Sequence, residues 1–414
     1  MGCSPSVFAA GKRKNQLNIL EIAIFVPSMC APLQTDIQRA LRGLVPKDLA
    51  DRIVSHRNQI VLIALGEETI GSGVTELQLS LEDYLPVLLG LTKKEHGLQD
   101  AVEFKWKYSE DGQEVCVASS WFELLSVIHM MAMLTLTEAN SMLISENQSG
   151  SAERIVSTDR MKDAVDLLLK ASGYLEFCVR EVLVHLPTDI KKQLPKDLQE
   201  GILEAISIQA LGQGTEIQLG LAVDSQNVSL PVKRRLACEQ LSYYGQAHYC
   251  LSRCNTDSKH GKKHLSFIKW KYLEAKAAAY YYHGQILDKG TEPSCHVSAV
   301  YCFLAADNIL SESKKACLTF CLTAPVTRIP PLWGAMKHLN KRIPDVASKK
   351  LQMYGYLLEQ EKGLEILPDL PEFEQSLRPD DYELPEMSSA WSRQTWEIPS
   401  QPLKEHLNDS EDEM

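Results

Sequence analysis

From residue 119 onward, apolar residues recur at the spacing of amphipathic or buried helices. The pattern predicts helices over about 120–144, 158–186, the segment after Pro195 up to 223, 229–254, 264–287 and 293–323. Ser120 and Glu123 have the spacing of a capping box at the start of the first helix. Most of these helices are roughly 25–30 residues long, whereas the mean is about 11–12. Long helices joined by short loops indicate a bundle or a helical solenoid, although the tetratricopeptide signature is not cleanly present.

Ahead of this helical region, the pattern changes. Leu17–Val26 is short, rich in β-branched residues and followed by Pro27, so it predicts a strand. A loop containing Gly66, Gly71 and Gly73 separates two apolar segments, and it lacks the Gly-Lys-Ser/Thr ending of a phosphate-binding loop. We therefore expect a mostly α-helical fold with a small N-terminal β element.

The two ends of the chain differ from its centre. From Pro368 onward, prolines interrupt an acidic stretch, which predicts an extended and partly disordered tail. This suggests a leader over residues 1–17, a helical domain over 18–365 and a tail over 366–414. The longest uncharged apolar stretch, Leu124–Thr137, has fourteen residues. It is too short to span a bilayer and is typical of a buried core helix.

Composition narrows the class of protein. The net charge of −11 and the lack of nucleic-acid-binding motifs argue against nucleic-acid binding. No secretory signal is expected, because polar residues 12–16 stand where a long apolar region would be needed. The eleven cysteines are scattered through apolar patterns, as expected for reduced thiols without disulfides.

No catalytic motif is recognisable, so we expect no enzyme activity and no cofactor. One cluster could bind zinc by its chemistry, namely His248, Cys250, Cys254, His260 and His264. Its spacing fits no common zinc module. Core cysteines and a solvated basic loop are the favoured interpretation, and a Cys/His-dependent enzyme is the alternative from another class.

A further group of polar residues lies inside an apolar helical pattern. Gln213 and Glu216 are accompanied by Gly212 and Gly214, and each mid-helix glycine costs roughly 1 kcal/mol relative to alanine. Close approach of two helices is the expected reason for these glycines, rather than catalysis.

The first residues, Met1-Gly2-Cys3-Ser4-Pro5-Ser6, match the pattern read by N-myristoyl transferase. Gly2 would carry the myristoyl chain and Cys3 could carry a palmitoyl chain. One myristoyl chain binds membranes only marginally, so a second signal is needed. The palmitoyl chain on Cys3 could supply it, and so could Lys12, Arg13 and Lys14, which would add about 3 kcal/mol at an anionic leaflet. An ordinary disordered start is the alternative.

Several segments, taken in order, resemble the BRO domain of the Alix and Brox family. They are Ala101–Trp106, Ser120–Asn140, Met161–Ala164, Lys170–Leu175, Leu211–Glu216, Lys233–Tyr244, Ala275–Ile286 and Ala299–Leu310. The ordered set covers about residues 18–365. It looks most like the Brox-type members, which are little more than one BRO domain, although their C-terminal lipidated cysteine box is missing from this sequence.

The resemblance implies a banana-shaped helical domain, built on a tetratricopeptide-like solenoid core, that acts as an ESCRT adaptor. Its concave face would bind the C-terminal amphipathic helix of an ESCRT-III subunit of the charged multivesicular body protein type. Lys162 matches the groove lysine, and Val232 and Leu236 match two apolar groove positions. A third anchor, normally aromatic, falls on Gln218, and an acidic position falls on Thr158. Core packing is the alternative role for Val232 and Leu236.

These observations together predict a lipid-anchored adaptor on the cytoplasmic face of membranes, endosomal or plasma membrane, with a cytosolic pool. The alternative is a membrane-tethered helical scaffold for a different peptide, with a polar residue facing Gln218.

Overall fold

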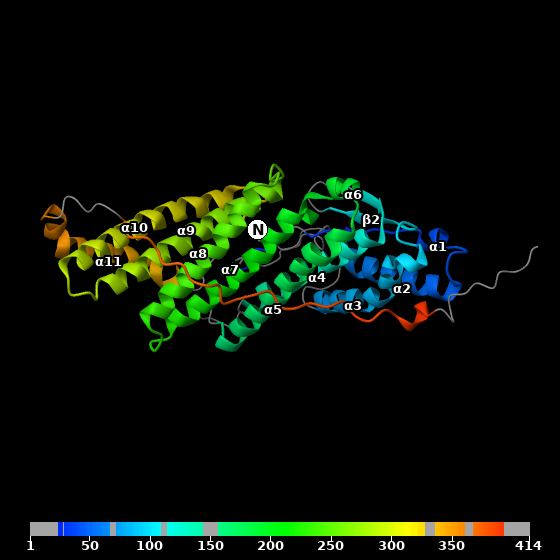
Figure 1. Ribbon diagram of the computed structural model, residues 1–414, viewed down its shortest axis with the longest axis horizontal. Helices are drawn as coiled ribbons and strands as arrows, with labels where there is room; N and C mark the ends of the chain where they lie inside the picture. The colour runs from blue at the N-terminus through cyan, green and yellow to red at the C-terminus, as the bar shows by residue number, and fades with distance from the viewer. Residues whose placement is uncertain are drawn as a thin grey trace, which may run out of the picture.

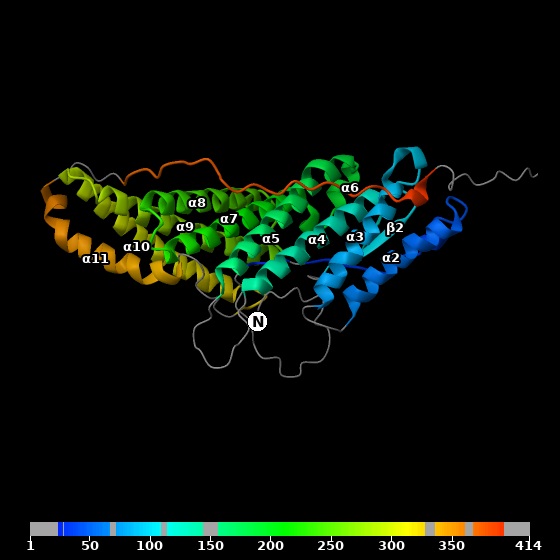
Figure 2. The same cartoon turned by 90° about the horizontal axis from the view of Figure 1, so that it is seen from below.

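The computed structural model describes residues 24–27, 29–66, 72–108, 114–143, 156–327, 336–360 and 367–392. Within these residues, helices dominate and lie side by side in an elongated body (Figure 1). Helices α11 and α2, at opposite ends, slope toward the same side and give the body its bend (Figure 2). The prediction of a mostly α-helical, banana-shaped fold is confirmed.

The helices follow one another along the body. Their bounds are α1 Ile37–Ala40, α2 Lys47–Leu65, α3 Ser72–Thr92, α4 Ser120–Leu143, α5 Thr158–Phe177, α6 Thr188–Gln193, α7 Glu200–Asp224, α8 Leu230–Ser252, α9 Lys259–Leu287, α10 Pro293–Leu322 and α11 Met336–Gln360. Five of the six predicted helices correspond closely to α4, α7, α8, α9 and α10, and α9 begins five residues earlier than predicted because Ser258 caps it. The sixth, over 158–186, divides into α5, a π-helical turn and a 3-10 turn.

Helices α2, α3 and α11 were not predicted. Pro86 lies inside α3 and Pro344 inside α11, and an internal proline normally indicates a helix end. Gly73 belongs to the first turn of α3 rather than to a loop. These helices form because their apolar faces find tertiary partners, which outweighs the local signals.

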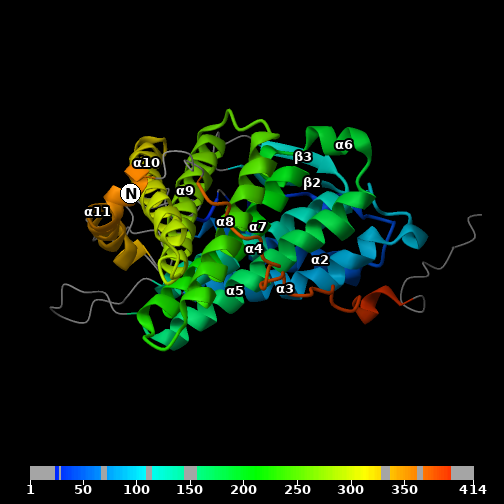
Figure 3. The same cartoon turned by 60° about the vertical axis from the view of Figure 1, so that its left-hand side comes forward.

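The β element is a three-stranded antiparallel sheet in the order β1, β2, β3. It pairs β1 Ala31–Pro32 with β2 Glu103–Lys107, and β2 with β3 Glu114–Ala118. The sheet lies at the end of the body that holds α2 and α6 (Figure 3).

The predicted strand Leu17–Val26 is wrong over the part that the structure describes. Residues 24–26 are irregular and buried in the helical core. The ring of Phe25 stacks on Phe267 with 4.8 Å between centroids, and the Ile24 amide donates to Asn140 Oδ1. Burial among helices, rather than strand pairing, explains the apolar pattern.

Helix α4 is the centre of the core and is surrounded by other elements. Among the described residues it is the one helix long and apolar enough to cross a membrane, and its side chains are mostly buried inside the protein. The predicted capping box is wrong. Ser119 Oγ accepts from the Phe122 amide, while Ser120 Oγ donates to the Leu91 carbonyl and Glu123 turns to Arg57.

Residues 367–392 form an extended strap along one face of the body, past α8, α7, α5 and α3 (Figure 2). Half-buried and exposed residues alternate along much of the strap, as in a strand that lies on a surface. The extended conformation predicted for the tail is confirmed over these residues. The proposed domain boundaries stay a prediction.

Candidate functional site

Helices α5, α7 and α8 form a continuous face, because α7 packs against both of the others. Small residues make this packing close. A Cβ on Gly212 would lie 3.3 Å from the side chain of Tyr243, and one on Gly214 would lie 3.1 Å from Leu377 and 3.7 Å from Val165. The interpretation as a point of close helix approach is confirmed for Gly212, whereas the tightest contact at Gly214 is with Leu377 of the strap.

The predicted groove residues lie on this three-helix face. Val165 on α5 and Gly214 on α7 meet beneath Leu377 of the strap. Lys162 lies one turn before Val165 on α5, and Gln218 lies one turn after Gly214 on α7. Each therefore lies on the same side of its helix as that neighbour. Lys162 is exposed, and its Nζ lies 3.5 Å from Asp159 Oδ1. Gln218 is half-buried.

The α8 positions complete the face. The Val232 side chain is 46% exposed, so it is free to contact a partner. Leu236, one turn later, is half-buried and packs against a cluster of buried side chains contributed by helices α7 to α11. Thr158, the position that is acidic in the resembled family, is exposed at the start of α5.

The strap forms one edge of the face through polar contacts with α8. Glu239 is buried and accepts hydrogen bonds from Arg235 Nε at 2.6 Å and from the Ser376 amide at 2.9 Å. The Tyr243 hydroxyl donates to the Leu377 carbonyl at 2.6 Å. The strap is therefore held in register along α8 by Glu239 and Tyr243, which lie one turn apart.

A buried charged cluster supports the face from beneath. Lys271 Nζ lies 2.8 Å from Glu216 Oε1 and 3.0 Å from Glu274 Oε2, and the Tyr244 hydroxyl donates to Glu216. Burial alone would lower the pKa of Lys271, but the two carboxylates outweigh it and raise that pKa. Burial also raises the pKa of Glu274. The cluster joins α7 to α8 and α9. Sequence reasoning missed it because Glu216 lies 55 residues before Lys271, although Glu274 is only three residues after it.

Four of the five residues of the possible zinc cluster have other hydrogen-bond partners. His264 Nε2 donates to Gln209 Oε1 at 2.6 Å, and burial lowers the pKa of His264 to about 3. The Cys254 thiol donates to the Cys250 carbonyl, and His248 contacts Ser252. In the part of the chain that the structure describes, no group of three His, Cys, Asp or Glu side chains could hold a metal ion.

The predicted lipidation residues Gly2 and Cys3, and the basic residues Lys12, Arg13 and Lys14, lie outside the described residues.

An elongated helical scaffold with an exposed three-helix face is thus the class of protein that the fold defines. The BRO1-like domain family matches residues 46–350, which is more than half of the chain. The chain belongs to the BRO1-like domain family.

Solved structures share the fold. A Bro1 domain described as the structural basis for endosomal targeting is 14% identical, with a TM-score of 0.57, over 89% of this chain and 94% of that one. The ALIX BRO1 CHMP4C complex is 13% identical, with a TM-score of 0.60, over 89% and 98%. ALIX bound to the SIVmac239 PYKEVTEDL late domain is 15% identical, with a TM-score of 0.56, over 88% and 50%. No curated protein sequence gives a match.

Proposed function

We propose that this protein is an adaptor whose α5–α7–α8 face binds the C-terminal amphipathic helix of an ESCRT-III subunit. Membership of the BRO1-like domain family supports this proposal, as does the ALIX BRO1 CHMP4C complex among the structures that share the fold. The observation that carries it for this chain is the exposed apolar side chain of Val232 beside half-buried Leu236 on α8.

The chemistry suits helix-in-groove recognition. In that mode, an amphipathic helix buries its apolar side, and charges at the margin set its register. Val232 and Leu236 are four residues apart and therefore share one side of α8. The exposed ammonium group of Lys162 on α5 offers a contact for an acidic residue of the ligand.

The test is binding of a CHMP4C C-terminal helix peptide to the full chain, wild type against Val232→Asp. Val232 is a sharper choice than Leu236, because Leu236 also packs in the hydrophobic core. Leu62→Asp is the matched control, since Leu62 is 69% exposed on α2, away from the face. We expect Val232→Asp to weaken binding by at least about tenfold, as for an apolar anchor worth roughly 1.4 kcal/mol or more. Equal binding by the wild type and Val232→Asp would contradict binding of the peptide at the α5–α7–α8 face.

Gln218 favours a second possibility for the ligand. It is half-buried on α7 at the position that the resembled family fills with an aromatic side chain. A buried amide needs a hydrogen-bond partner, so a peptide with a polar residue at this point would bind better than an apolar one. Gln218→Phe should then tighten binding of the CHMP4C helix and weaken binding of the natural ligand. A Gln218→Phe variant with unchanged affinity for both would place Gln218 outside the contact.

We also propose that a lipid anchor holds this adaptor at membranes, through Gly2 with Cys3 and the basic residues Lys12, Arg13 and Lys14. The support is the sequence pattern alone. Labelling of cells with a myristate analogue should mark the wild type and leave Gly2→Ala unmarked and cytosolic. Cys3→Ser should keep the label but bind membranes less stably. A Gly2→Ala protein that stays on membranes would contradict the anchor.

A further inference from the structure

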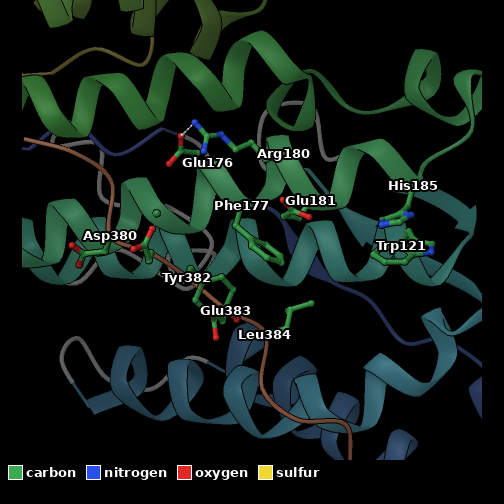
Figure 4. Close-up of a pocket in the computed structure, with 12 residues that line it drawn as sticks. Trp121, Glu176, Phe177, Arg180, Glu181, His185, Asp380, Tyr382, Glu383 and Leu384 are labelled. Carbon is green, nitrogen blue, oxygen red and sulfur yellow. Dashed lines mark ion pairs between the residues drawn. The ribbon is translucent and has the colours of Figure 1, made fainter.

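A cavity of about 500 Å³ lies between the strap and the helical body, at the opposite end of α5 from Lys162 (Figure 4). The start of α4, the end of α5 and the turn after α5 form one wall. Strap residues 380–384 form the other. Its size is typical of ligand sites in proteins.

Aromatic rings line this cavity. The Trp121 and His185 rings stack with centroids 4.0 Å apart, and Phe177 meets Tyr382 edge-on at 5.1 Å. Trp121, Phe177 and Tyr382 are each half-buried. Part of each ring is therefore open to a ligand.

The charges around the rings are mostly negative. Glu176 is neutralised by Arg180, whose Nη2 lies 2.6 Å from its carboxylate (Figure 4). Glu181, Asp381 and Glu383 are exposed carboxylates that form no ion pair with the described residues. Burial, followed by the charges of Asp166 and Asp381, raises the pKa of Asp380, and Lys170 offsets part of that rise.

The strap beside the cavity has a free backbone. The Asp380 amide donates to the Leu169 carbonyl, and the Ser388 amide donates to the Pro86 carbonyl. Between these two points, no hydrogen bond within the described part of the chain reaches the backbone of residues 381–387. That stretch is held by side chains such as Tyr382, which packs on Tyr174 and Phe177. An extended segment with unpaired amides and carbonyls is what a peptide needs for strand addition.

We propose that this cavity binds an extended basic peptide. The peptide backbone pairs with strap residues 381–384, and an arginine side chain enters the cavity. Its planar guanidinium stacks on Phe177 and Trp121, which suits arginine better than lysine. Glu181 and Glu383 accept its hydrogen bonds from the two walls. The site is separate from the helix-binding face and does not depend on the function proposed above.

The test is calorimetric titration of the full chain with a capped Thr-Val-Arg-Val-Thr peptide. The matched peptide carries Gln in place of Arg, and arginine amide serves as the small-cation probe. We expect saturable binding of the Arg peptide only. The double variant Glu181→Gln, Glu383→Gln should weaken it about tenfold, as for two partly exposed charge pairs. Glu386→Gln is the matched control, because Glu386 is exposed on the same strap but does not line the cavity, and should bind as the wild type does.

Several outcomes would overturn the proposal. Equal binding of the Gln peptide would exclude the charged contact, and equal binding of arginine amide would exclude strand addition. If Glu386→Gln lost as much affinity for the Arg peptide as the double variant, the affinity would depend only on the net charge of the protein. Competition by the CHMP4C helix, or a loss of Arg-peptide binding in Val232→Asp, would show that the two sites are not separate. All the substituted carboxylates are exposed, so the variants are expected to fold.

Discussion

The helical body and the strap are held in place in two different ways. In the body, polar groups are buried and paired, as where Arg57 Nε lies 2.8 Å from Glu123 and Trp106 Nε1 donates to the same carboxylate. Both ion-pair side chains are almost fully buried. In the strap, Trp391 alone among the described residues is buried, and the rest lie on the surface. Loss of a body contact should therefore affect the whole fold, whereas loss of a strap contact should affect only the strap.

This difference matters for function because the strap borders both candidate sites. Near α8 it is fixed by hydrogen bonds to Glu239 and Tyr243, which should keep the edge of the three-helix face rigid. Beside the acidic cavity, the Asp380 amide donates to the Leu169 carbonyl, and residues 381–387 are then fixed by side-chain packing. We therefore expect the face to be preformed and the cavity wall to adjust when a peptide binds.

The largest effect is expected from Arg57→Met. This change leaves the buried carboxylate of Glu123 without its cation and removes the hydrogen bonds to the Leu33 and Lys105 carbonyls. Breaking a buried pair in this way costs about 4 kcal/mol. Urea unfolding followed by far-UV circular dichroism measures the loss. Arg52→Met on the same helix is exposed and should cost little. Equal stability of the two variants would contradict the role of the pair.

Trp391→Ala should have the next largest effect and should release the end of the strap. The indole occupies the space that a Cβ on Gly90 would need, its Nε1 donates to the Val87 carbonyl, and its ring stacks on His96. Removal of such a side chain costs about 3 kcal/mol. Hydrogen exchange should rise in 380–392 while the helices stay protected. Leu367→Ala, at the exposed start of the strap, is the control, and general loss of helix protection would show that the strap supports the whole body.

The pH dependence of stability should be smaller and should belong to the body. Burial lowers the pKa of His129 to about 4, and its Nε2 has no hydrogen-bond partner among the described residues. The unfolded chain therefore binds more protons below about pH 6.5, and stability falls as the pH is lowered through that range. Between neutral pH and about pH 5, the free energy of unfolding should fall by about 2 kcal/mol less in His129→Leu than in the wild type. An unchanged pH profile of urea midpoints would assign that loss to other groups, such as His264.

Gly173→Ala should have the smallest effect on overall stability but a clear effect on the strap. A Cβ at this position would lie 2.2 Å from the Asp380 carbonyl oxygen, so the strap must move away. Alanine favours the helix by about 1 kcal/mol, which offsets part of the cost. A Cβ added at Gly355 on α11 has no other atom within 4 Å, so Gly355→Ala measures the helix preference of alanine alone. Hydrogen exchange of 380–388 should rise only in Gly173→Ala, and equal exchange would contradict the close approach.

Sequence reasoning recovered most of the long helices and their order, because burial of one side of a helix produces apolar residues at regular spacing. Ser229 and Pro293 marked the starts of α8 and α10 correctly, because helix starts favour such residues. It failed at residues 24–26, the described part of the predicted strand, which pack among helices instead of pairing with a strand. It also failed at Glu123, which looked like half of a capping box and is the partner of Arg57. Local spacing cannot show which distant group will neutralise a buried charge.

The candidate sites divide in the same way. The sequence placed Lys162, Val232 and Leu236 within predicted helices, and the structure places them on helices α5 and α8. Their role in binding a partner stays a prediction. The acidic cavity could not be anticipated, because it forms only where residues near 380 lie against residues near 177. The sequence by itself determined the helical periodicity, the family and the extended character of residues 367–392. Only the tertiary structure decided where the strap lies and which charges are paired, because both depend on contacts between residues that are far apart along the chain.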